Sequence, residues 1–359
     1  MDLSKAFDTL DLNVLIEKLK HYGVRGISNE WFSSYLSNRS QFVEIDGHTS
    51  YNLCKIMYGV PQGSILGPLL FNIYINDFFE CLTFGQAIMF ADDTTLIFKC
   101  KDLRYLEAMV NEDLHSASEW LAENKLSLNI DKTNYMYFNM STRNDFIPNI
   151  GIRSRSIQSV ETQKFLGVIF DSKLSWKPHI ISVINKLNSC LGATRRARPF
   201  LNKTSLLSIY YSLMQTHAQY CCTTWASWKS RGNQVILQRL QAVCNKYFRL
   251  IYNLERDESV REILKKDDIL NVHQLYDYNL GQLMYKVKMK ELPIPLQNNF
   301  QIGIQRPCMF KVSPSRIQKT QKSIYQSGPK VWNSLPITIS AEINFDTFKT
   351  NLKKYIINK

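Results

Sequence analysis

The stretch from Ala87 to Phe98 reads AIMFADDTTLIF and holds two adjacent acids, Asp92 and Asp93, between two apolar runs. Runs rich in β-branched and aromatic residues on either side of a short polar turn predict a β-hairpin. Two carboxylates held so close together repel each other unless a cation neutralises them. Magnesium suits such a site, because it binds one or two carboxylates together with substrate phosphates. An Asp-Asp pair in a turn also occurs as ordinary solvated turn chemistry, so the rest of the chain has to decide between the two interpretations.

Four other segments accompany this hairpin in a fixed order. They read DLSKAFD at 2–8, YGVPQGSILGPLLFN at 58–72, LSLNIDKT at 126–133 and KFLGV at 164–168. Together with 87–98, these blocks resemble the palm motifs of reverse transcriptases, and more narrowly the polymerase region of a non-LTR retrotransposon of the jockey type. The resemblance is specific from residue 1 to about residue 175. It continues more loosely to SGPKVWNSLP at 327–336, which is similar to a block near the end of such polyproteins.

The resemblance implies an α+β fold, with a right-hand polymerase palm of antiparallel sheet and flanking helices, then a helical thumb and a C-terminal helical region. Apolar spacing in the first part predicts helices at about 12–22, 29–36, 64–79 and 103–123, and strands at 42–47, 53–57, 135–138 and 165–170. Asp46-Gly47 predicts a turn at the end of the first strand, and Pro68 is expected in the first turn of the 64–79 helix. Beyond Lys177 it predicts helices at about 177–192, 203–215, 232–252 and 272–290. We expect three regions: a palm with partial fingers at 1–175, a thumb or connection region at 176–292, and a partly loosely folded C-terminal region at 293–359.

The resemblance also assigns the catalytic acids. Asp2 and Asp92 would be the main ligands of two Mg²⁺ ions, for which Mn²⁺ can substitute, and Asp93 would support them. The backbone carbonyl of Leu3 would complete the coordination. Two such ions, roughly 3.5–4 Å apart, stabilise the charge on the attacking and leaving oxygens of a phosphoryl transfer. We therefore expect the carboxylates of Asp2 and Asp92 to converge.

Further roles follow from the same resemblance. An aromatic at Phe7 would stack under the nucleotide sugar and exclude a 2′-hydroxyl, while Gln62 and Gly63 would contact the nucleotide or template. Lys132 would neutralise or protonate the pyrophosphate leaving group, and we expect Asp8 to be structural. The hairpin at Phe165, Leu166 and Gly167 resembles the primer grip. Simpler interpretations stay open, namely a core phenylalanine, a plain helix start after residue 63 and a surface lysine.

Charge is distributed unevenly along the 359 residues. The whole chain carries +13, but residues 1–140 hold 11 Lys and Arg against 18 Asp and Glu, a net charge of −7, which leaves +20 for residues 141–359. A basic half suits a protein that grips nucleic acid, although a solvated basic surface has the same composition. The eight cysteines form no CxxC pair, which predicts free thiols in a reducing compartment. No apolar run approaches the length of a membrane span.

The resemblance implies an RNA-directed DNA polymerase whose partners are an RNA template, a DNA primer and deoxynucleoside triphosphates, with no membrane and no indicated protein partner. It implies an intracellular ribonucleoprotein of nucleus and cytoplasm. The family's fingers blocks and endonuclease domain have no counterpart ahead of Asp2, so we expect a fragment. A catalytically inactive nucleic-acid-binding remnant is therefore the second hypothesis. A metal-dependent hydrolase is the third, and the motif order argues against it.

Overall fold

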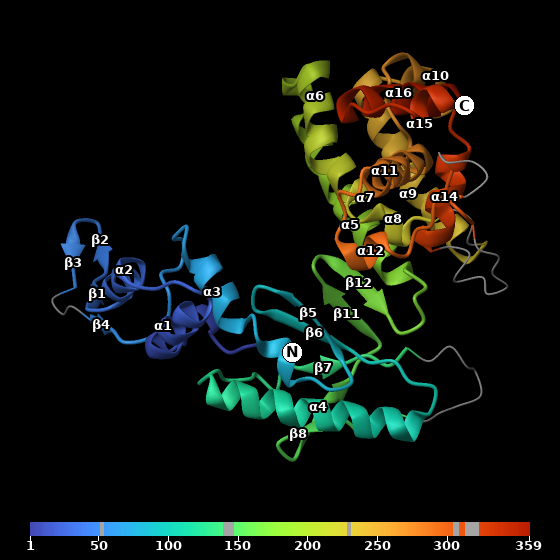
Figure 1. The fold of residues 1–359 in the computed structure, drawn as a ribbon. Helices are drawn as coiled ribbons and strands as arrows, with labels where there is room; N and C mark the ends of the chain where they lie inside the picture. The colour runs from blue at the N-terminus through green and yellow to red at the C-terminus, as the bar shows by residue number, and fades with distance from the viewer. Residues whose placement is uncertain (51–53, 139–146, 228–230, 304–308, 313–322) are drawn as a thin grey trace. The chain divides into compact units, whose positions relative to one another are not determined.

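The structure is a computed structural model that describes residues 1–50, 54–138, 147–227, 231–303, 309–312 and 323–359. Their contacts divide the chain into two units, Met1–Glu161 and Thr162–Lys359 (Figure 1). In the described part of the chain, no helix is long and apolar enough to cross a membrane. Helices and small, mostly antiparallel sheets occur in both units, which confirms the predicted α+β class. The assignment of palm and thumb stays a prediction at this point.

Three helices of the first unit share one apolar core: α1 (Leu12–His21), α3 (Gly67–Ile75) and α4 (Leu103–Glu123). The carboxylate of Asp11 caps α1 by accepting the backbone N–H groups of Asn13 and Val14, which α1 itself cannot satisfy. Helix α3 begins three residues later than expected, with Pro68 in its first turn as predicted, where a missing N–H costs nothing. The other helical elements here are α2 (Ile27–Leu36), η1 (Ala6–Asp8) and η2 (Phe78–Cys81).

The predicted acidic hairpin is present. Strand β5 (Gln86–Phe90) pairs antiparallel with β6 (Asp93–Ile97) (Figure 1). Phe90 faces Asp93 across the turn. The turn itself is Ala91-Asp92, with Ala91 at φ 51, as a two-residue hairpin that follows the strand twist requires.

The predicted Asp46-Gly47 turn also forms and joins β2 (Glu44–Ile45) to β3 (His48–Thr49). The expected return strand, however, pairs elsewhere: β4 (Cys54–Ile56) lies against β1 (Arg39–Gln41), and Leu53 falls outside the described residues. The strand expected at 135–138 shrinks to β7 (Asn134–Tyr135), which pairs in parallel with β10 (Gln158–Ser159). A further small hairpin joins β8 (Gly151–Ile152) to β9 (Arg155–Ser156).

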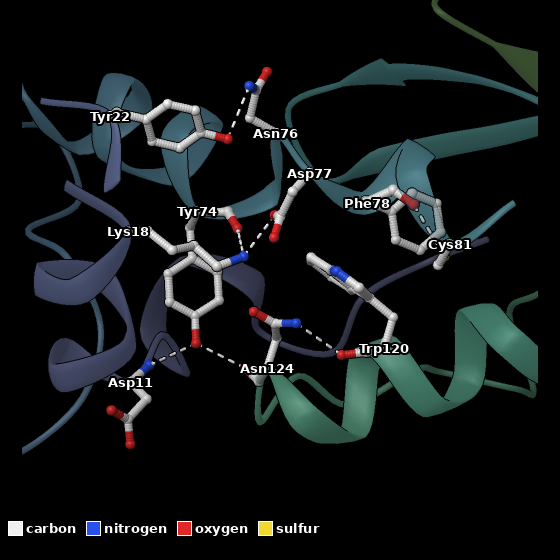
Figure 2. Close-up of polar contacts among 10 residues, drawn as sticks. All are labelled: Asp11, Lys18, Tyr22, Tyr74, Asn76, Asp77, Phe78, Cys81, Trp120 and Asn124. Atoms are coloured by element: carbon white, nitrogen blue, oxygen red, sulfur yellow. Dashed lines mark hydrogen bonds and ion pairs between the residues drawn. The ribbon is translucent and has the colours of Figure 1, made fainter. Parts of the chain in front are cut away.

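A polar network inside the first unit ties its three core helices together (Figure 2). The Lys18 ammonium donates to the backbone carbonyl of Tyr74 at 2.7 Å and to the Asp77 carboxylate at 2.6 Å, and it lies 4.7 Å from the ring centre of Trp120. Burial lowers the pKa of Lys18, and the hydrogen bond to Asp77 opposes that shift. The Tyr74 hydroxyl donates to the carbonyl of Asn124 at 2.7 Å, so helices α1, α3 and α4 meet at shared polar groups.

A second buried acid fixes the start of β5. Asp113 is fully buried on α4, and its carboxylate accepts the backbone N–H groups of Thr83, Phe84 and Gly85. Three such donors replace the water that a buried carboxylate loses. A Cβ on Gly85 would lie 2.6 Å from the Phe98 ring, so any larger residue here would displace that ring. Helix α4 thus sets where the acidic hairpin begins.

In the second unit, α5 (Lys177–Ala197) and α9 (Arg231–Tyr252) pack against each other around buried aromatics such as Trp225 and Tyr247. The helix predicted at 203–215 extends to residue 219 and is irregular. Helix α6 (Lys203–Ile209) continues through a π-helical segment (the π-turn), η4 (Tyr210–Gln215), into α7 (Thr216–Gln219). Shorter elements are η3 (Arg198–Phe200), α8 (Cys222–Trp225), α10 (Arg261–Lys266), α12 (Ile294–Gln297) and α15 (Ile337–Ser340).

The C-terminal helices α14 (Ile324–Asn333) and α16 (Phe345–Asn358) pack on α11 (Val272–Lys288). Glycines make these approaches possible: a Cβ on Gly328 would lie 2.6 Å from the Met284 sulfur, and one on Gly281 would lie 2.7 Å from Leu352. From residue 323 the chain is therefore helical and packed. The stretches 304–308 and 313–322, where looser folding was expected, lie outside the described residues.

The unit boundary falls at residues 161 and 162, whereas the sequence placed the first region's end near residue 175. The hairpin of β11 (Thr162–Phe165) and β12 (Val168–Asp171) belongs with the second unit, because Val168 is buried in the same core as α5. The division of the chain into palm, thumb and C-terminal regions stays a prediction.

Candidate active site

Asp2 lies directly opposite Asp93 in an antiparallel pair. Residues opposed in this way point to the same face of the sheet, with Cβ atoms about 4.5–5.5 Å apart. The Met1 amino group donates to the Thr94 carbonyl at 2.7 Å and extends this pairing. On the other side, Leu3 pairs with Leu128, so the strand that carries Asp2 lies between β6 and the 126–129 segment.

The Met1 amino group interacts electrostatically with both acids. Burial lowers the pKa of the Met1 amino group, and the carboxylates of Asp2 and Asp93 both act on it in the opposite direction. The ammonium of Lys132 is 3.9 Å from Asp2 Oδ2, while the Asp2 side chain keeps 34% of its surface exposed. The site is therefore an open acidic face with one lysine at its edge.

The convergence expected of the Asp2 and Asp92 carboxylates stays a prediction. The residue that faces Asp2 is Asp93, and Asp92 is the exposed turn residue that precedes it. Among the described residues, no group of three or more His, Cys, Asp or Glu side chains is arranged to hold a metal ion. The donors nevertheless fit magnesium, because carboxylate oxygens on one face can bind it while water and substrate phosphates complete its shell.

The 126–133 block forms the wall beside Asp2. The backbone N–H of Asn129 donates to the Asp2 carbonyl at 2.9 Å, and the hydroxyl of Thr133 accepts the Asp2 N–H at 3.4 Å. Thr133 is buried, and its hydroxyl donates back to Asn129. Sequence reasoning singled out Lys132 here and missed Asn129 and Thr133. Their signal was the position of two short polar residues around the lysine, at the turn that carries it.

The 58–63 block lies against the segment that follows Asp2. Gly59 donates its N–H to the Leu10 carbonyl, and Val60 donates to Phe7. A Cβ on Gly59, at φ +84, would lie 2.7 Å from the Asp8 backbone, so the approach requires glycine. The amide of Gln62 then donates to the Asp8 carboxylate at 2.8 Å.

These contacts show where the nucleotide-contact candidates lie. Asp8 holds Gln62, while Gly63 is exposed at φ +78 with open space around its Cα. Phe7 stacks on the buried ring of Phe71 with centroids 4.5 Å apart and stays half-exposed. A partly buried ring is compatible with the sugar contact and with the simpler role of a core aromatic.

The remaining candidates lie in the second unit. Phe165, Leu166 and Gly167 form the tip of the β11–β12 hairpin, where Phe165 faces Val168 and the two-residue turn has φ values of 45 and 82. The predicted hairpin is thus confirmed as a structure. The site residues of the first unit are assembled from four of the five sequence blocks.

Comparisons with known proteins agree with this assembly. Residues 1–170 match the family described as "Reverse transcriptase (RNA-dependent DNA polymerase)". The chain is 24% identical over 290 residues to the RNA-directed DNA polymerase from mobile element jockey of Drosophila melanogaster, covering 74% of this chain and 31% of that protein. It is 28% identical over 213 residues to the jockey polymerase of Drosophila funebris, covering 55% and 22%.

A third relative is the Pol polyprotein from type-1 retrotransposable element R1 of Bradysia coprophila, 23% identical over 233 residues that cover 63% of this chain and 22% of the relative. The chain thus spans less than a third of the length of these curated relatives. Residues 1–170 therefore form a reverse transcriptase domain, which is related to those of non-LTR retrotransposons such as jockey and R1.

Proposed function

We propose that this chain carries the synthetic site of an RNA-directed DNA polymerase, which adds deoxynucleotides to a primer 3′-hydroxyl along an RNA template. The observation that supports this most directly is the pairing of Asp2 with Asp93, with Asp92 in the adjoining turn. An acidic face of this kind suits in-line transfer at a phosphate, where positioning and charge stabilisation supply most of the catalysis.

Asp2, Asp92 and Asp93 would hold two Mg²⁺ ions, or Mn²⁺ in their place, with the Leu3 carbonyl as a further ligand. When bound, the ions would stabilise charge on the attacking and leaving oxygens. The protein's own contribution is to keep the acids on one strand pair. Lys132, 3.9 Å from Asp2, would offset the negative charge of a departing pyrophosphate.

Phe7 and the Gln62-Gly63 turn would hold the nucleotide. Phe7 stacks on Phe71 and stays partly exposed, which suits contact with a deoxyribose and exclusion of a 2′-hydroxyl. Asp8 orients the Gln62 amide, and an open glycine at position 63 lets a phosphate or base approach the backbone.

The second unit would bind primer and template. The tip at Phe165, Leu166 and Gly167 would act as a primer grip, which positions the 3′ end and does not react. The excess of +20 in residues 141–359 supports contact with phosphates. The association with template RNA would make the chain part of a ribonucleoprotein of nucleus and cytoplasm.

Primer extension on an RNA template tests the proposal. The chain is assayed with Mg²⁺ or Mn²⁺, and Asp2→Asn and Asp92→Ala are compared with Asp131→Asn as a control for loss of one acid beside the site. We expect DNA synthesis by the unsubstituted chain and by the Asp131→Asn control, and no synthesis by Asp2→Asn or Asp92→Ala. Synthesis that survives Asp92→Ala would refute the site. RNA binding with no synthesis under any condition would favour the non-catalytic remnant instead.

A further inference from the structure

The β11–β12 hairpin is held at two points by residues that follow it in the chain. Its tip, Leu166-Gly167, has both residues in the left-handed region, with φ values of 45 and 82. A two-residue turn of this kind is narrow and follows the strand twist, but a two-stranded hairpin is only marginally stable by itself. The position of this tip therefore depends on what contacts it.

Tyr220 is the contact at the tip. Its hydroxyl donates to the Leu166 carbonyl at 2.7 Å, across 54 residues of sequence. Its ring lies over the other turn residue, since a Cβ on Gly167 would be 3.2 Å from Tyr220 Cε1. A bulkier residue at 167 would displace the ring, so one tyrosine contacts both residues of the turn.

His179 is the contact at the return strand. Its Nδ1 accepts the backbone N–H of Ile169 in β12 at 3.2 Å, so the ring must be neutral with its proton on Nε2. That Nε2 is buried and has no hydrogen-bond partner among the described residues. An unpartnered buried polar atom has a cost, so the bond from Ile169 is the one hydrogen bond of this ring among the described residues.

Trp225 joins the two contacts. Its indole N–H donates to the Tyr220 carbonyl at 2.9 Å, and its ring meets the His179 ring edge-to-face with centroids 5.1 Å apart. Trp225 is fully buried. A continuous set of contacts thus links the hairpin tip to its return strand through Tyr220, Trp225 and His179. Because Trp225 is buried, these contacts are anchored in the core of the second unit.

We propose that Tyr220 and His179 are positioning residues that clamp the β11–β12 hairpin at its tip and its return strand, and so set where a primer end is held. The inference rests on the proposed function, because only a polymerase gives this hairpin a primer to hold. Neither residue touches a reacting atom. Both act through the backbone of the hairpin.

Hydrogen exchange of the full chain tests the clamp without any need for activity. Tyr220→Phe removes one exposed hydroxyl, so the fold should survive, and Tyr211→Phe removes a hydroxyl from the π-turn as a matched control. We expect exchange across 162–171 to rise by about threefold or more in Tyr220→Phe, as loss of one hydrogen bond allows, and to stay unchanged in the control. Equal exchange in Tyr220→Phe and the unsubstituted chain would overturn the clamp at the tip.

A pair of variants tests the second contact. His179→Leu removes the acceptor for the Ile169 N–H, and His179→Gln restores one on a side chain of similar reach. We expect the Ile169 amide to exchange faster in His179→Leu and to recover in His179→Gln. Identical exchange in all three proteins would overturn the role of His179, and circular dichroism shows that each variant is folded.

Primer extension then tests whether the clamp on the hairpin also affects primer positioning. Tyr220→Phe should lower kcat by about threefold to tenfold, the effect of one lost hydrogen bond, with KM for the nucleotide unchanged. A looser hairpin with unchanged kcat would overturn the link to the primer. If the unsubstituted chain makes no DNA, the proposed function fails, and the exchange results still decide whether the clamp exists.

Discussion

Asp2 and Asp93 are cross-strand partners, although they come from opposite ends of the chain's first hundred residues. Asp92, whose carboxylate the family pattern expects to converge with that of Asp2, occupies the turn one residue earlier. Backbone pairing places Asp2 and Asp93 on one face, so a ligand that binds one carboxylate also meets the other.

This pairing predicts that the two acids act as a unit. Asp2→Asn and Asp93→Asn should each abolish most primer extension, and the double variant should lose little more than either single one, since residues that act together are non-additive. Single-turnover rates of all four proteins give the comparison. Losses that multiply in the double variant would mean that the acids work independently.

Salt should control the binding of nucleic acid. Because residues 141–359 carry the excess of +20, affinity for RNA without sequence preference should fall steeply between 50 and 200 mM salt, as roughly one counterion is released per phosphate contact. Removal of two exposed charges at the end of α5, by Arg195→Ala with Arg196→Ala, should flatten the slope of log K against log salt. Binding that does not change with salt would contradict a phosphate-binding surface.

Lys18 should matter for stability far more than its neighbour on the same helix. Lys18→Met leaves Asp77 without its ammonium, and we expect a loss of about 1–3 kcal/mol in the free energy of unfolding, the range for hydrogen bonds to charged groups. Lys20→Met is the control, because Lys20 pairs with Glu17 at the surface with 48% and 70% of the side chains exposed, and such pairs contribute about 0–1 kcal/mol. Urea unfolding measures both, and equal losses would mean that the buried network adds nothing.

Gly59 should tolerate no side chain. Gly59→Ala places a Cβ 2.7 Å from the Asp8 backbone, so it should destabilise the chain by about 1–3 kcal/mol more than Gly47→Ala, as overpacking does. Gly47 is the matched control, since its φ of +80 carries the same backbone strain but its Cβ would meet nothing within 4 Å in the described part of the chain. Thermal unfolding distinguishes the two, and similar melting temperatures would show that the 58–63 block can move away from Asp8.

His179 should make stability depend on pH. Burial, with a smaller effect from the charge of Lys186, lowers the pKa of His179 from 6.5 to about 4. Above pH 6.5 the imidazole is neutral in the folded and unfolded chains, and its contribution is complete. As pH falls from 6.5 towards 4, His179 becomes protonated in the unfolded chain but stays neutral in the folded chain. The free energy of unfolding should therefore fall by up to about 1.4 kcal/mol per pH unit. Unfolding of His179→Gln over the same range should lack this component, and parallel curves would contradict it.

Local patterns in the sequence predicted much of this fold. Apolar spacing gave α1 and α4 within a residue or two, and turn chemistry gave the hairpins at Asp46-Gly47 and Ala91-Asp92. The motifs also predicted that Asp2, the acidic hairpin and Lys132 lie near one another. These features depend on residues close in sequence or on a family pattern, and both can be seen in a single chain.

Other features depend on partners that no local pattern names. The pairing of β4 with β1 and the contact of Tyr220 with Leu166 join distant segments. In the sequence, Asp113 is one of several acids on an amphipathic helix. Its burial is explained by the backbone N–H groups of residues 83–85, which it accepts and which no local pattern indicates. The same holds for Asp93, because strand register decides which of two adjacent acids faces Asp2.

The π-turn at Tyr210–Gln215 has a consequence for how sequences of this kind can diverge. A helix advances about 100° per residue, so the wide turn sets the direction in which Tyr220 leaves the end of α7. Deletion of a single residue from α7 would rotate the tyrosine away from Leu166 by about 100° while leaving every contact residue intact. Gain or loss of one residue in this helix would thus remove the support of the hairpin tip more easily than any single substitution within the helix.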